Sequence, residues 1–322
     1  MEAVMKAAVL VAPGRMEVHD VAMPQPAAGE VRIRLEGCGV CASNIEPWEG
    51  RAWSTFPGAP GGMGHEGWGV VDALGVGVTA VAPGQRVTLL GGNGFAEYDV
   101  ARADQVVALP EALAGRAVPG EPVACAMNIF RRSDLRAGQT VAIVGIGFLG
   151  AILTKLASDA GARVIAISRR AESLALATRF GAAETVAMDD HWAIIERVTA
   201  MTGEAMCERV IEAVGKQWPL DLASALVGFG GRLVIAGYHQ DGARQVNMQD
   251  WNWKGIDVVN AHERDPRAAM RGLEEAVAAV AAGRIDLDAL VTHRFPLERV
   301  GEAIAATRDK PEGFVKAVVT YA

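Results

Sequence analysis

Cysteine is scarce in this chain of 322 residues, which has four thiols, at Cys38, Cys41, Cys125 and Cys207. Four cysteines at such scattered positions are too few for the disulfide framework of a small secreted domain. Positive charge is also in short supply, because 31 Lys and Arg stand against 38 Asp and Glu, for a net charge of −7. Proteins bind nucleic acids through a surplus of cationic side chains, so we expect no nucleic-acid partner.

Long apolar segments are missing as well. The stretch 137–154 carries no charge between Arg136 and Lys155, and its 18 residues come near the lower limit for a membrane span. It contains four glycines and three polar side chains, which favour a buried strand, turn and helix, so we expect no membrane contact. Residues 1–6 resemble the approach to a first strand and not a signal peptide, which makes the cytoplasm the expected location.

The chain does have enough apolar material for two domains, with 51% hydrophobic residues over its length. Residues 1 to about 120 contain strand-forming segments separated by glycine and proline, which predicts a barrel-like β domain. From about 126 to 262, strand and helix patterns alternate, which predicts a doubly wound parallel sheet in an α/β protein. The predicted strands of this sheet are 141–144, 163–167, 185–188, 208–214, 231–236 and 256–261. A helix over 266–283 and a last strand over 314–319 are predicted to follow.

Three candidate metal ligands lie on glycine-rich segments. Gly64-His65-Glu66-Gly67 offers an imidazole and a carboxylate, and Cys41, at the end of Gly37-Cys38-Gly39-Val40-Cys41, offers a thiolate. This donor set suits zinc, and a catalytic zinc needs about three protein ligands and one open position. An isolated histidine would more often be an ordinary core residue, but the three donors together predict a zinc site.

A second motif predicts dinucleotide binding. The β-branched run 140–144 is followed by Gly145-Ile146-Gly147-Phe148-Leu149-Gly150, which opens a helical pattern. Gly145 permits a tight turn, Gly147 lets the backbone approach a pyrophosphate, and Gly150 lets the helix and strand pack closely. The phosphates would meet the helix N-terminus, where free N–H groups and the helix dipole favour anions.

The end of the second predicted strand indicates which nicotinamide cofactor binds. An NAD enzyme places an acidic residue there to hold the ribose 2′-hydroxyl, whereas this chain has Ser168, Arg169 and Arg170. A hydroxyl and two guanidiniums suit a 2′-phosphate, because the planar guanidinium matches phosphate oxygens. The arginines could also be a solvated helix start, but a basic pair is disfavoured at the positive end of a helix. We expect NADP(H) in preference to NAD(H).

The pattern from Gly64 to Val78 resembles the catalytic-zinc signature of the zinc-dependent medium-chain dehydrogenase/reductase superfamily, which includes the alcohol dehydrogenases. Glu121-Pro122, the segment 292–297 and the ending Gly313-Phe-Val-Lys316 are similar to its sorbitol and threonine dehydrogenase branch. The similarity extends over the whole chain. It implies an oxidoreductase with a discontinuous catalytic domain.

The resemblance implies specific domain limits and zinc ligands. A GroES-like β-barrel catalytic domain would comprise 1–125 and 263–322, and a Rossmann domain would comprise 126–262. Cys41 and His65 would bind zinc, Glu66 would be a third or switching ligand, and Glu121 a direct or water-bridged fourth. Cys125 competes with Glu121 for the last role, and the Glu-Pro pair favours Glu121.

The chain departs from the family pattern in three places. Residues 90–95 form a short loop without cysteine where a structural-zinc lobe would stand, so we expect one zinc per chain. Asn44 replaces an aspartate that orients the zinc shell, and Glu46 replaces a relay histidine. Cys38 is expected to be a small buried residue, because the family uses only the second cysteine of the pair.

The family pattern also implies roles near the reacting groups. Ser43 would carry the proton away from the substrate, although it could be an ordinary turn residue. Lys316 would lie near the pyrophosphate, or on the surface. Apart from the family pattern, Trp48 and Trp53 are near the zinc turn in the sequence, and they could line the substrate pocket, be exposed or pack in the barrel.

The expected function is the transfer of a hydride between NADP(H) and an alcohol, a polyol or its carbonyl counterpart, with zinc as a Lewis acid. A zinc-free quinone or enoyl reductase and a non-catalytic NADPH-binding module are the alternatives. We expect a homodimer or homotetramer, because the last strand of the parallel sheet, within 245–260, would be an exposed edge in a monomer.

Overall fold

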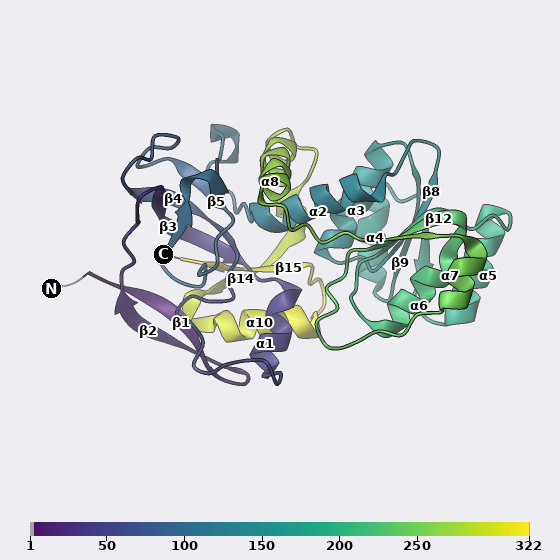
Figure 1. Ribbon diagram of the computed structural model, residues 1–322, viewed down its shortest axis with the longest axis horizontal. Helices are drawn as coiled ribbons and strands as arrows, with labels where there is room; N and C mark the ends of the chain where they lie inside the picture. Colours follow the sequence, from purple (N-terminus) through teal and green to yellow (C-terminus); the bar gives the residue numbers. More distant parts are fainter. Residues whose placement is uncertain (1–2, 322) are drawn as a thin grey trace. The chain divides into compact units, whose positions relative to one another are not determined.

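The computed structural model describes residues 3–321, and the chain divides into two compact units (Figure 1). The barrel unit comprises Met1–Ala124 and Leu273–Ala322, and the parallel-sheet unit comprises Cys125–Gly272. The domain ranges predicted from the sequence place the second boundary before helix α8 (Pro266–Ala281), whereas the compact units divide inside this helix. Residues 1, 2 and 322, which the predicted ranges include, lie outside the described residues.

The barrel unit is built on a seven-stranded sheet of order β14-β15-β3-β4-β5-β7, with β6 paired to β3, and on the pair β1-β2. Its strands are β1 (Val4–Ala12), β2 (Arg15–Ala22), β3 (Glu30–Gly39), β4 (Glu66–Leu74), β5 (Arg86–Leu89), β6 (Tyr98–Arg102), β7 (Val106–Ala108), β14 (Val291–Pro296) and β15 (Lys316–Thr320). β15 runs antiparallel to β3 with Val318 opposite Gly39, so the C-terminal strand completes a sheet begun near the N-terminus. The colours of Figure 1 show this closure, because the yellow strands lie beside purple ones.

The central strand of this sheet is half buried, as its sequence pattern predicts. Val31, Ile33 and Leu35 of β3 are at most 2% exposed, and Arg32 and Arg34 between them are less buried. The three apolar side chains pack with residues of β4 and β5 in one cluster, as alternation along a strand requires. This packing fixes the register that brings the ends of β3 and β4 together.

Short helices surround the barrel strands. They are η1 (Ala42–Asn44), α1 (Ile45–Glu49), η2 (Ala103–Gln105), η3 (Glu111–Leu113), α9 (Leu287–Leu290), η4 (Leu297–Arg299) and α10 (Val300–Asp309). Helix α2 (Gly120–Ser133) begins in the barrel unit and ends in the parallel-sheet unit.

The parallel-sheet unit contains six parallel strands in the order β10-β9-β8-β11-β12-β13. They are β8 (Thr140–Val144), β9 (Arg163–Ser168), β10 (Glu184–Ala187), β11 (Cys207–Glu212), β12 (Val227–Ile235) and β13 (Asp257–Asn260). The helices between them are α3 (Phe148–Asp159), α4 (Ala171–Arg179), α5 (His191–Thr202), α6 (Gln217–Leu226) and α7 (Met248–Lys254). The order reverses between β8 and β11, where ligands of doubly wound sheets bind at the carboxyl ends of the strands. The predicted doubly wound sheet is confirmed.

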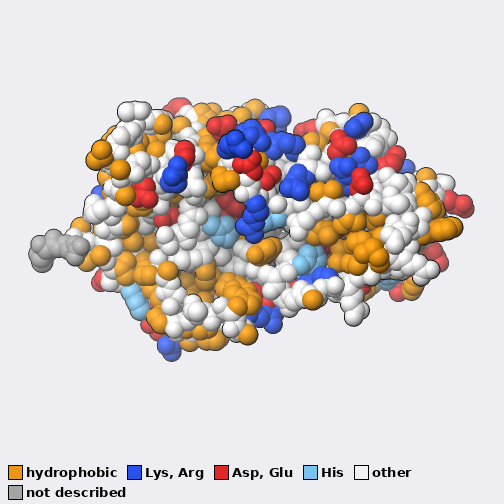
Figure 2. Space-filling view, viewed as in Figure 1, with side chains coloured by type: hydrophobic (Ala, Val, Ile, Leu, Met, Phe, Trp, Pro, Cys, Tyr) orange, Lys and Arg blue, Asp and Glu red, His pale blue; other side chains and the backbone are white. Residues whose placement is uncertain are grey.

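The surface is charged but not of one sign. Figure 2 shows Lys and Arg side chains interspersed with Asp and Glu on the face in view. No helix within residues 3–321 is long and apolar enough to cross a bilayer.

Candidate metal and dinucleotide sites

The predicted zinc ligands Cys41, His65 and Glu66 form a donor cluster in the barrel unit. One ligand atom from each side chain lies within 4.8 Å of the other two. The register of β3 and β4 causes this convergence, because Gly39 pairs with Glu66 and the chain continues from each into the donor segments. Thiolate, imidazole and carboxylate in this arrangement are a donor set that zinc accepts.

A glycine makes room for the carboxylate of this cluster. Gly39 pairs with Glu66, and a Cβ at Gly39 would lie 1.8 Å from Oε2 of Glu66. Such an approach is impossible for a side-chain carbon, so any larger residue would displace the carboxylate. Gly39 is therefore part of what places Glu66 at the site.

The imidazole of His65 is held by the backbone of Met63. Nδ1 of His65 donates a hydrogen bond of 2.8 Å to the Met63 carbonyl oxygen. Met63 has a φ of 75°, in the left-handed region, which turns this carbonyl toward the ring. With its proton on Nδ1, His65 keeps Nε2 for a metal, which is the usual arrangement of a metal-bound histidine.

Asn44 joins the two segments that carry the donors. Its Oδ1 accepts a hydrogen bond of 3.0 Å from the Cys41 N–H, and its Nδ2 donates one of 2.8 Å to the Met63 carbonyl. The side chain is 2% exposed, so water competes little for these bonds. The neutral amide thus orients the donor segments through two backbone groups.

The electrostatics of the donor cluster favour an added positive charge. Burial lowers the pKa of His65, but the hydrogen bond and charge of Cys41 and the charges of Glu66 and Glu121 outweigh it and raise this pKa to about 10. The donor set, the fixed tautomer and the negative surroundings all fit zinc.

Glu66 has a second charged neighbour in Lys316. The Nζ atom of Lys316 lies 2.6 Å from both carboxylate oxygens, and it donates a hydrogen bond to Oε1. The geometry toward Oε2 is that of an ion pair without a hydrogen bond, so Oε2 is a buried oxygen with no hydrogen-bond partner among the described residues.

The position of Lys316 excludes one of its two predicted environments. This lysine does not lie on the surface, because its side chain is buried in the barrel unit and bonded to Glu66, whereas its place near the pyrophosphate stays a prediction. Burial lowers the pKa of Lys316, and the Glu66 carboxylate, with Cys41 and Glu121, more than offsets this and raises it. The ammonium balances the negative charge of the donor cluster.

Glu121 acts electrostatically on the donor cluster. It stands in the first turn of α2, and its charge contributes to raising the pKa values of His65 and Lys316. Thr88 holds this helix start, because its hydroxyl accepts from the Gly120 N–H and donates to the Gly67 carbonyl, each at 3.1 Å. The fourth-ligand role of Glu121, with Cys125 as its competitor, remains a prediction.

Cys38 lies in the core of the barrel unit. It is 0% exposed, and burial, followed by the charge of Glu66, raises the pKa of its thiol well above the usual range. Its Sγ donates to the Gly39 carbonyl at 3.4 Å. A thiol in these surroundings is a poor source of the thiolate that zinc requires.

The loop at 90–95 is organised by a carboxylate. Asp99 is 2% exposed, and its oxygens accept from the backbone N–H groups of Gly92, Asn93 and Val100 at 3.3, 3.2 and 2.8 Å. Tyr321 donates a hydrogen bond to the Gly94 carbonyl in the same loop. These contacts, which the sequence did not predict, organise the loop at 90–95.

The remaining predicted residues of the barrel unit lie near Cys41. The N–H of Ser43 is 3.5 Å from the Cys41 sulfur, so the first turn after this cysteine carries the serine. Glu46, in the place of the relay histidine, is buried and bonded to Arg51. Trp48 packs in the core, whereas Trp53 is 55% exposed.

The glycine motif of the parallel-sheet unit has the geometry of a dinucleotide turn. Gly145 has a φ of 102°, and a Cβ at Gly150 would lie 2.0 Å from the Gly145 carbonyl oxygen. Gly147, the N-cap of α3, has open space where its side chain would be, so a phosphate could approach the backbone there. Phe148 and Leu149 form the first turn of this helix.

The candidate 2′ site lies at the carboxyl end of β9. Ser168 ends this strand and is 6% exposed, and Arg169 after it is exposed. Arg170 is the N-cap of α4 and forms an ion pair of 3.4 Å with Glu172. Arg169 is therefore the more accessible guanidinium for a phosphate.

A buried glutamate stiffens the carboxyl edge of the same sheet. Glu212 ends β11, is 0% exposed, and accepts from the Val214 and Gly215 N–H groups at 2.7 and 2.8 Å. His239 contacts the same carboxylate at 2.9 Å through Nε2. This network joins the loops after β11 and β12.

Comparison with known proteins identifies the family. The sequence pattern of the Zinc-binding dehydrogenase family matches residues 149–279, and that of the Alcohol dehydrogenase GroES-like domain matches 27–111. An alcohol dehydrogenase of Moraxella sp. (strain TAE123) is 31% identical, with 98% of this chain and 99% of the relative aligned. The chain belongs to the zinc-type medium-chain dehydrogenase/reductase superfamily.

Two further relatives agree with this assignment. A sorbitol dehydrogenase of Gallus gallus is 26% identical over 92% of this chain and 91% of its own. The crystal structure of a candidate zinc-binding dehydrogenase from Sinorhizobium meliloti 1021, bound to NADP, has a TM-score of 0.86, 27% identity, and coverage of 99% of this chain and 100% of that one. The predicted family and the GroES-like plus Rossmann fold are confirmed, and the protein is an oxidoreductase of this dehydrogenase family.

Proposed function

We propose that this protein is a zinc-dependent dehydrogenase that prefers NADP(H) and transfers a hydride between that cofactor and an alcohol, a polyol or the corresponding carbonyl compound. The observation that carries the proposal is the donor cluster, in which Cys41, His65 and Glu66 converge within 4.8 Å. The orientation of His65 toward Met63 supports it, because Nε2 is then left for the metal.

Bound at the donor cluster, zinc supplies the Lewis acidity that lowers the pKa of an alcohol hydroxyl. The chain's own residues have separate tasks around it. Cys41 and His65 are the permanent ligands, and Glu66 is the third or switching ligand, with its charge balanced by Lys316. Ser43, on the turn after Cys41, accepts the hydroxyl proton and passes it on.

The preference for NADP(H) rests on the end of β9. Ser168 and Arg169 stand where an NAD enzyme would place a carboxylate, and the exposed guanidinium of Arg169 suits a 2′-phosphate. The NADP found in the related Sinorhizobium meliloti structure supports the same cofactor. The open backbone at Gly147 is the proposed contact for the pyrophosphate.

Metal analysis combined with a substrate screen tests this function. The purified protein should contain about one zinc per chain and should reduce NADP faster than NAD with some members of a panel of secondary alcohols, diols and sugar alcohols. Cys41→Ser and His65→Ala should lose zinc and activity together, because each removes a ligand. Cys38→Ser is the matched control and should keep both, since this thiol lies in the core.

Other outcomes would point elsewhere. A zinc-free protein that reduces enones and quinones but oxidises no alcohol would be a reductase of the zinc-free type. A zinc-loaded protein that binds NADPH but turns over no substrate of the panel would be a non-catalytic module. Loss of zinc in Cys38→Ser with retention in Cys41→Ser would show that the wrong thiol has been assigned.

A further inference from the structure

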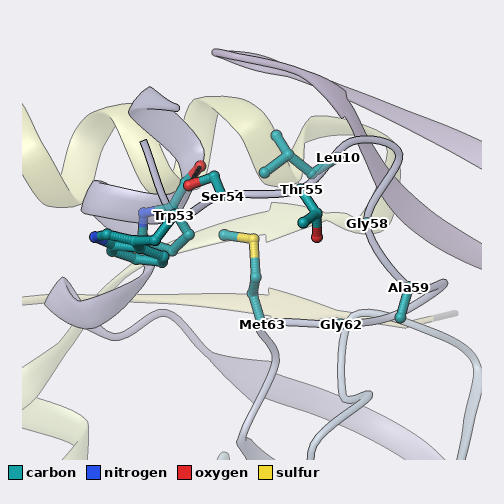
Figure 3. A pocket seen from close by; sticks show the side chains of 9 residues that line it. Leu10, Trp53, Ser54, Thr55, Gly58, Ala59, Gly62 and Met63 are labelled. Carbon is teal, nitrogen blue, oxygen red and sulfur yellow. Dashed lines mark hydrogen bonds between the residues drawn. The ribbon is translucent and has the colours of Figure 1, made fainter. Parts of the chain in front are cut away.

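Two cavities of the barrel unit differ in what surrounds them. The first lies between Trp53 and Met63, beside the segment that leads to His65 (Figure 3). Because the Met63 carbonyl holds His65, this first cavity belongs to the surroundings of the donor cluster. The second cavity, of about 370 Å³, is lined by the turn between β1 and β2, by α1 and by the segment from η4 into α10. None of its described lining residues belongs to the donor cluster or to the glycine motif of the parallel-sheet unit.

Trp48 contributes a buried polar group to the second cavity. It is 8% exposed, and its Nε1 is a buried donor with no hydrogen-bond partner among the described residues. A Cβ at Gly14, on the cavity wall, would lie 3.9 Å from Cζ2 of Trp48. Since Cζ2 and Nε1 are bonded to the same ring carbon, the edge of the indole that carries Nε1 is turned toward this wall. A buried donor without an acceptor destabilises the protein, so a ligand that supplies an acceptor here would be bound favourably.

The indole of Trp48 is fixed by its surroundings. The Gly14 N–H donates a hydrogen bond of 2.7 Å to the Trp48 carbonyl, which joins the β1–β2 turn to α1. The guanidinium carbon of Arg308 lies 5.1 Å from the centre of the indole and covers one of its faces. The ring also packs with the apolar core of the barrel unit. The N–H therefore keeps its direction when no ligand is bound.

The start of α10 adds positive potential to the same cavity. This helix has 10 residues, and its N-cap, Arg299, makes no side-chain capping hydrogen bond. The first N–H groups of a helix have no partner within the helix, so an uncapped start offers them to water or to a ligand. Gly301, in the first turn, is part of the cavity wall. The dipole of the helix favours a negative charge at this place.

The charged side chains that line the cavity cancel one another. Arg299 donates to Glu302 at 2.8 and 2.5 Å, which pairs one cation with one anion. Arg15 forms an exposed ion pair of 3.3 Å with Glu17, which does not line the cavity, and Glu298 is exposed. The preference for an anion therefore comes from the indole N–H and the start of α10. These two groups suit one negative charge and not the several charges of a nucleotide.

We infer that the second cavity binds a small organic carboxylate, with one oxygen on Nε1 of Trp48 and the other near the start of α10. Met16 and Ala305 offer apolar contact to a short carbon chain. Because the cavity shares no described residue with the donor cluster, this ligand is an effector and not the substrate of the hydride transfer. The inference does not depend on the proposed function.

The test follows the indole N–H of Trp48 by proton–nitrogen correlation NMR of the full chain, with propionate as the probe. Sodium propionate should move this signal downfield and saturably, because the N–H gains a charged acceptor. Trp48→Phe identifies the signal by its loss and should weaken propionate binding by about ten- to a hundredfold, the effect of one hydrogen bond to a charged group. The amide signals of Gly14 and Gly301 report the affinity in each protein. Trp192→Phe makes the same replacement at a 71% exposed position of the parallel-sheet unit and should leave the affinity unchanged.

Two further measurements decide the question if Trp48→Phe does not fold. Arg15→Gln alters an exposed side chain and should weaken propionate binding by about two- to fivefold, as for an exposed charge pair. Propionamide has the shape of propionate without its charge and should bind the wild type more weakly. The inference would be overturned by the absence of a saturable shift of the Trp48 signal with propionate, by the same shift with sodium chloride at equal ionic strength, or by equal binding of propionamide.

Discussion

The Nζ atom of Lys316 lies 2.6 Å from both carboxylate oxygens of Glu66, and the two side chains are 7% and 0% exposed. The pair joins the first residue of β15 to the first residue of β4. Each charge compensates the other in a place that water does not reach. A buried ion pair of this kind is costly to break, because removal of one partner leaves the other charge unpaired.

Lys316→Met should therefore destabilise the metal-free protein. We expect the free energy of unfolding to fall by about 3–5 kcal/mol, the usual cost of leaving one member of a buried pair uncompensated. Zinc should restore more stability to the variant than to the wild type, because a bound cation gives Glu66 a new counter-charge. Urea unfolding of both proteins with and without zinc measures this difference.

Lys155→Met is the matched control for this substitution. Lys155 pairs with Asp159 on α3, and both side chains are partly exposed. Removal of an exposed pair changes stability by at most about 0.5 kcal/mol. Equal effects of the two substitutions would mean that the Lys316–Glu66 pair contributes no more than a surface ion pair.

Asn44 is predicted to control metal affinity without being a ligand. Asn44→Ala removes the hydrogen bonds to the Cys41 N–H and the Met63 carbonyl, so the two donor segments lose their shared support. Loss of such an outer contact weakens metal binding by roughly 10- to 100-fold. Competition with a chromophoric zinc chelator gives the affinity. Asn93→Ala, in the loop at 90–95, is the control. If this variant loses as much zinc affinity as Asn44→Ala, the effect comes from a general loss of order in the barrel unit and not from the two hydrogen bonds of Asn44.

Asp99 should make stability depend on pH in a specific direction. Burial raises the pKa of this carboxyl above its ordinary value, although four hydrogen bonds, three from the loop at 90–95 and one from the Val100 N–H, oppose the shift. An acid with a raised folded-state pKa binds its proton more tightly in the folded chain. The stability that this carboxyl adds to the folded protein is therefore fully present below about pH 4. This stability is lost as the pH rises through the raised pKa. Relative to Asp99→Asn, the wild type should lose stability as the pH rises from about 4.

Asp104 is a control, because its pKa shift should make stability depend on pH in the opposite direction. Its hydrogen bonds from Arg102, at 2.9 and 2.7 Å, lower the pKa of this exposed carboxyl. The stability that this carboxylate adds is present above its pKa in the unfolded chain. It is lost as the pH falls through its lower pKa in the folded protein. Relative to Asp104→Asn, the wild type should therefore gain stability as the pH rises. Urea unfolding across this pH range gives both slopes, and parallel curves for wild type and Asp99→Asn would rule out the assignment.

Much of the fold could be predicted because its signals are local. The run Val164-Ile-Ala-Ile167 and the glycines from Gly145 to Gly150 carry their strand and turn preferences within a few residues, and the structure places β9 and the turn there. The donor cluster was predictable because a family signature spans it. The pairing of Lys316 with Glu66 was not, since it joins residues 250 positions apart through the register of β15 and β3. The support that Thr88 and Met63 give to the site likewise depends on tertiary contacts that no local pattern contains.

Self-association through the edge of the parallel sheet is the next prediction. β13 pairs with β12 on one side only, and Trp253 just before it is 78% exposed. Trp251, on the same helix, donates to Ser224 Oγ at 3.0 Å and packs against the core. We propose that β13 meets its copy across a two-fold axis and that Trp253 is covered there.

Trp253→Glu should weaken this homodimer or homotetramer, because it places a charge in the proposed contact. Light scattering after size-exclusion chromatography should show oligomers for the wild type and a shift toward monomer for the variant. Trp192→Glu alters another exposed tryptophan and should leave the mass unchanged. A wild type that is monomeric at all concentrations tested would end the proposal.

The cofactor preference should respond to the two residues at the end of β9. Arg169→Ala with Ser168→Asp removes an exposed guanidinium and installs a carboxylate that can accept a hydrogen bond from the ribose 2′-hydroxyl. A charge-assisted hydrogen bond contributes about 1.5–3 kcal/mol, so NADP should bind roughly ten- to a hundredfold more weakly. NAD has no 2′-phosphate to lose, and its binding should improve or stay level. The zinc content should not change, because the donor cluster belongs to the barrel unit. Values of kcat/KM for both cofactors with one alcohol measure the shift, and an unchanged NADP-to-NAD ratio would show that Ser168 and Arg169 do not contact the 2′ position.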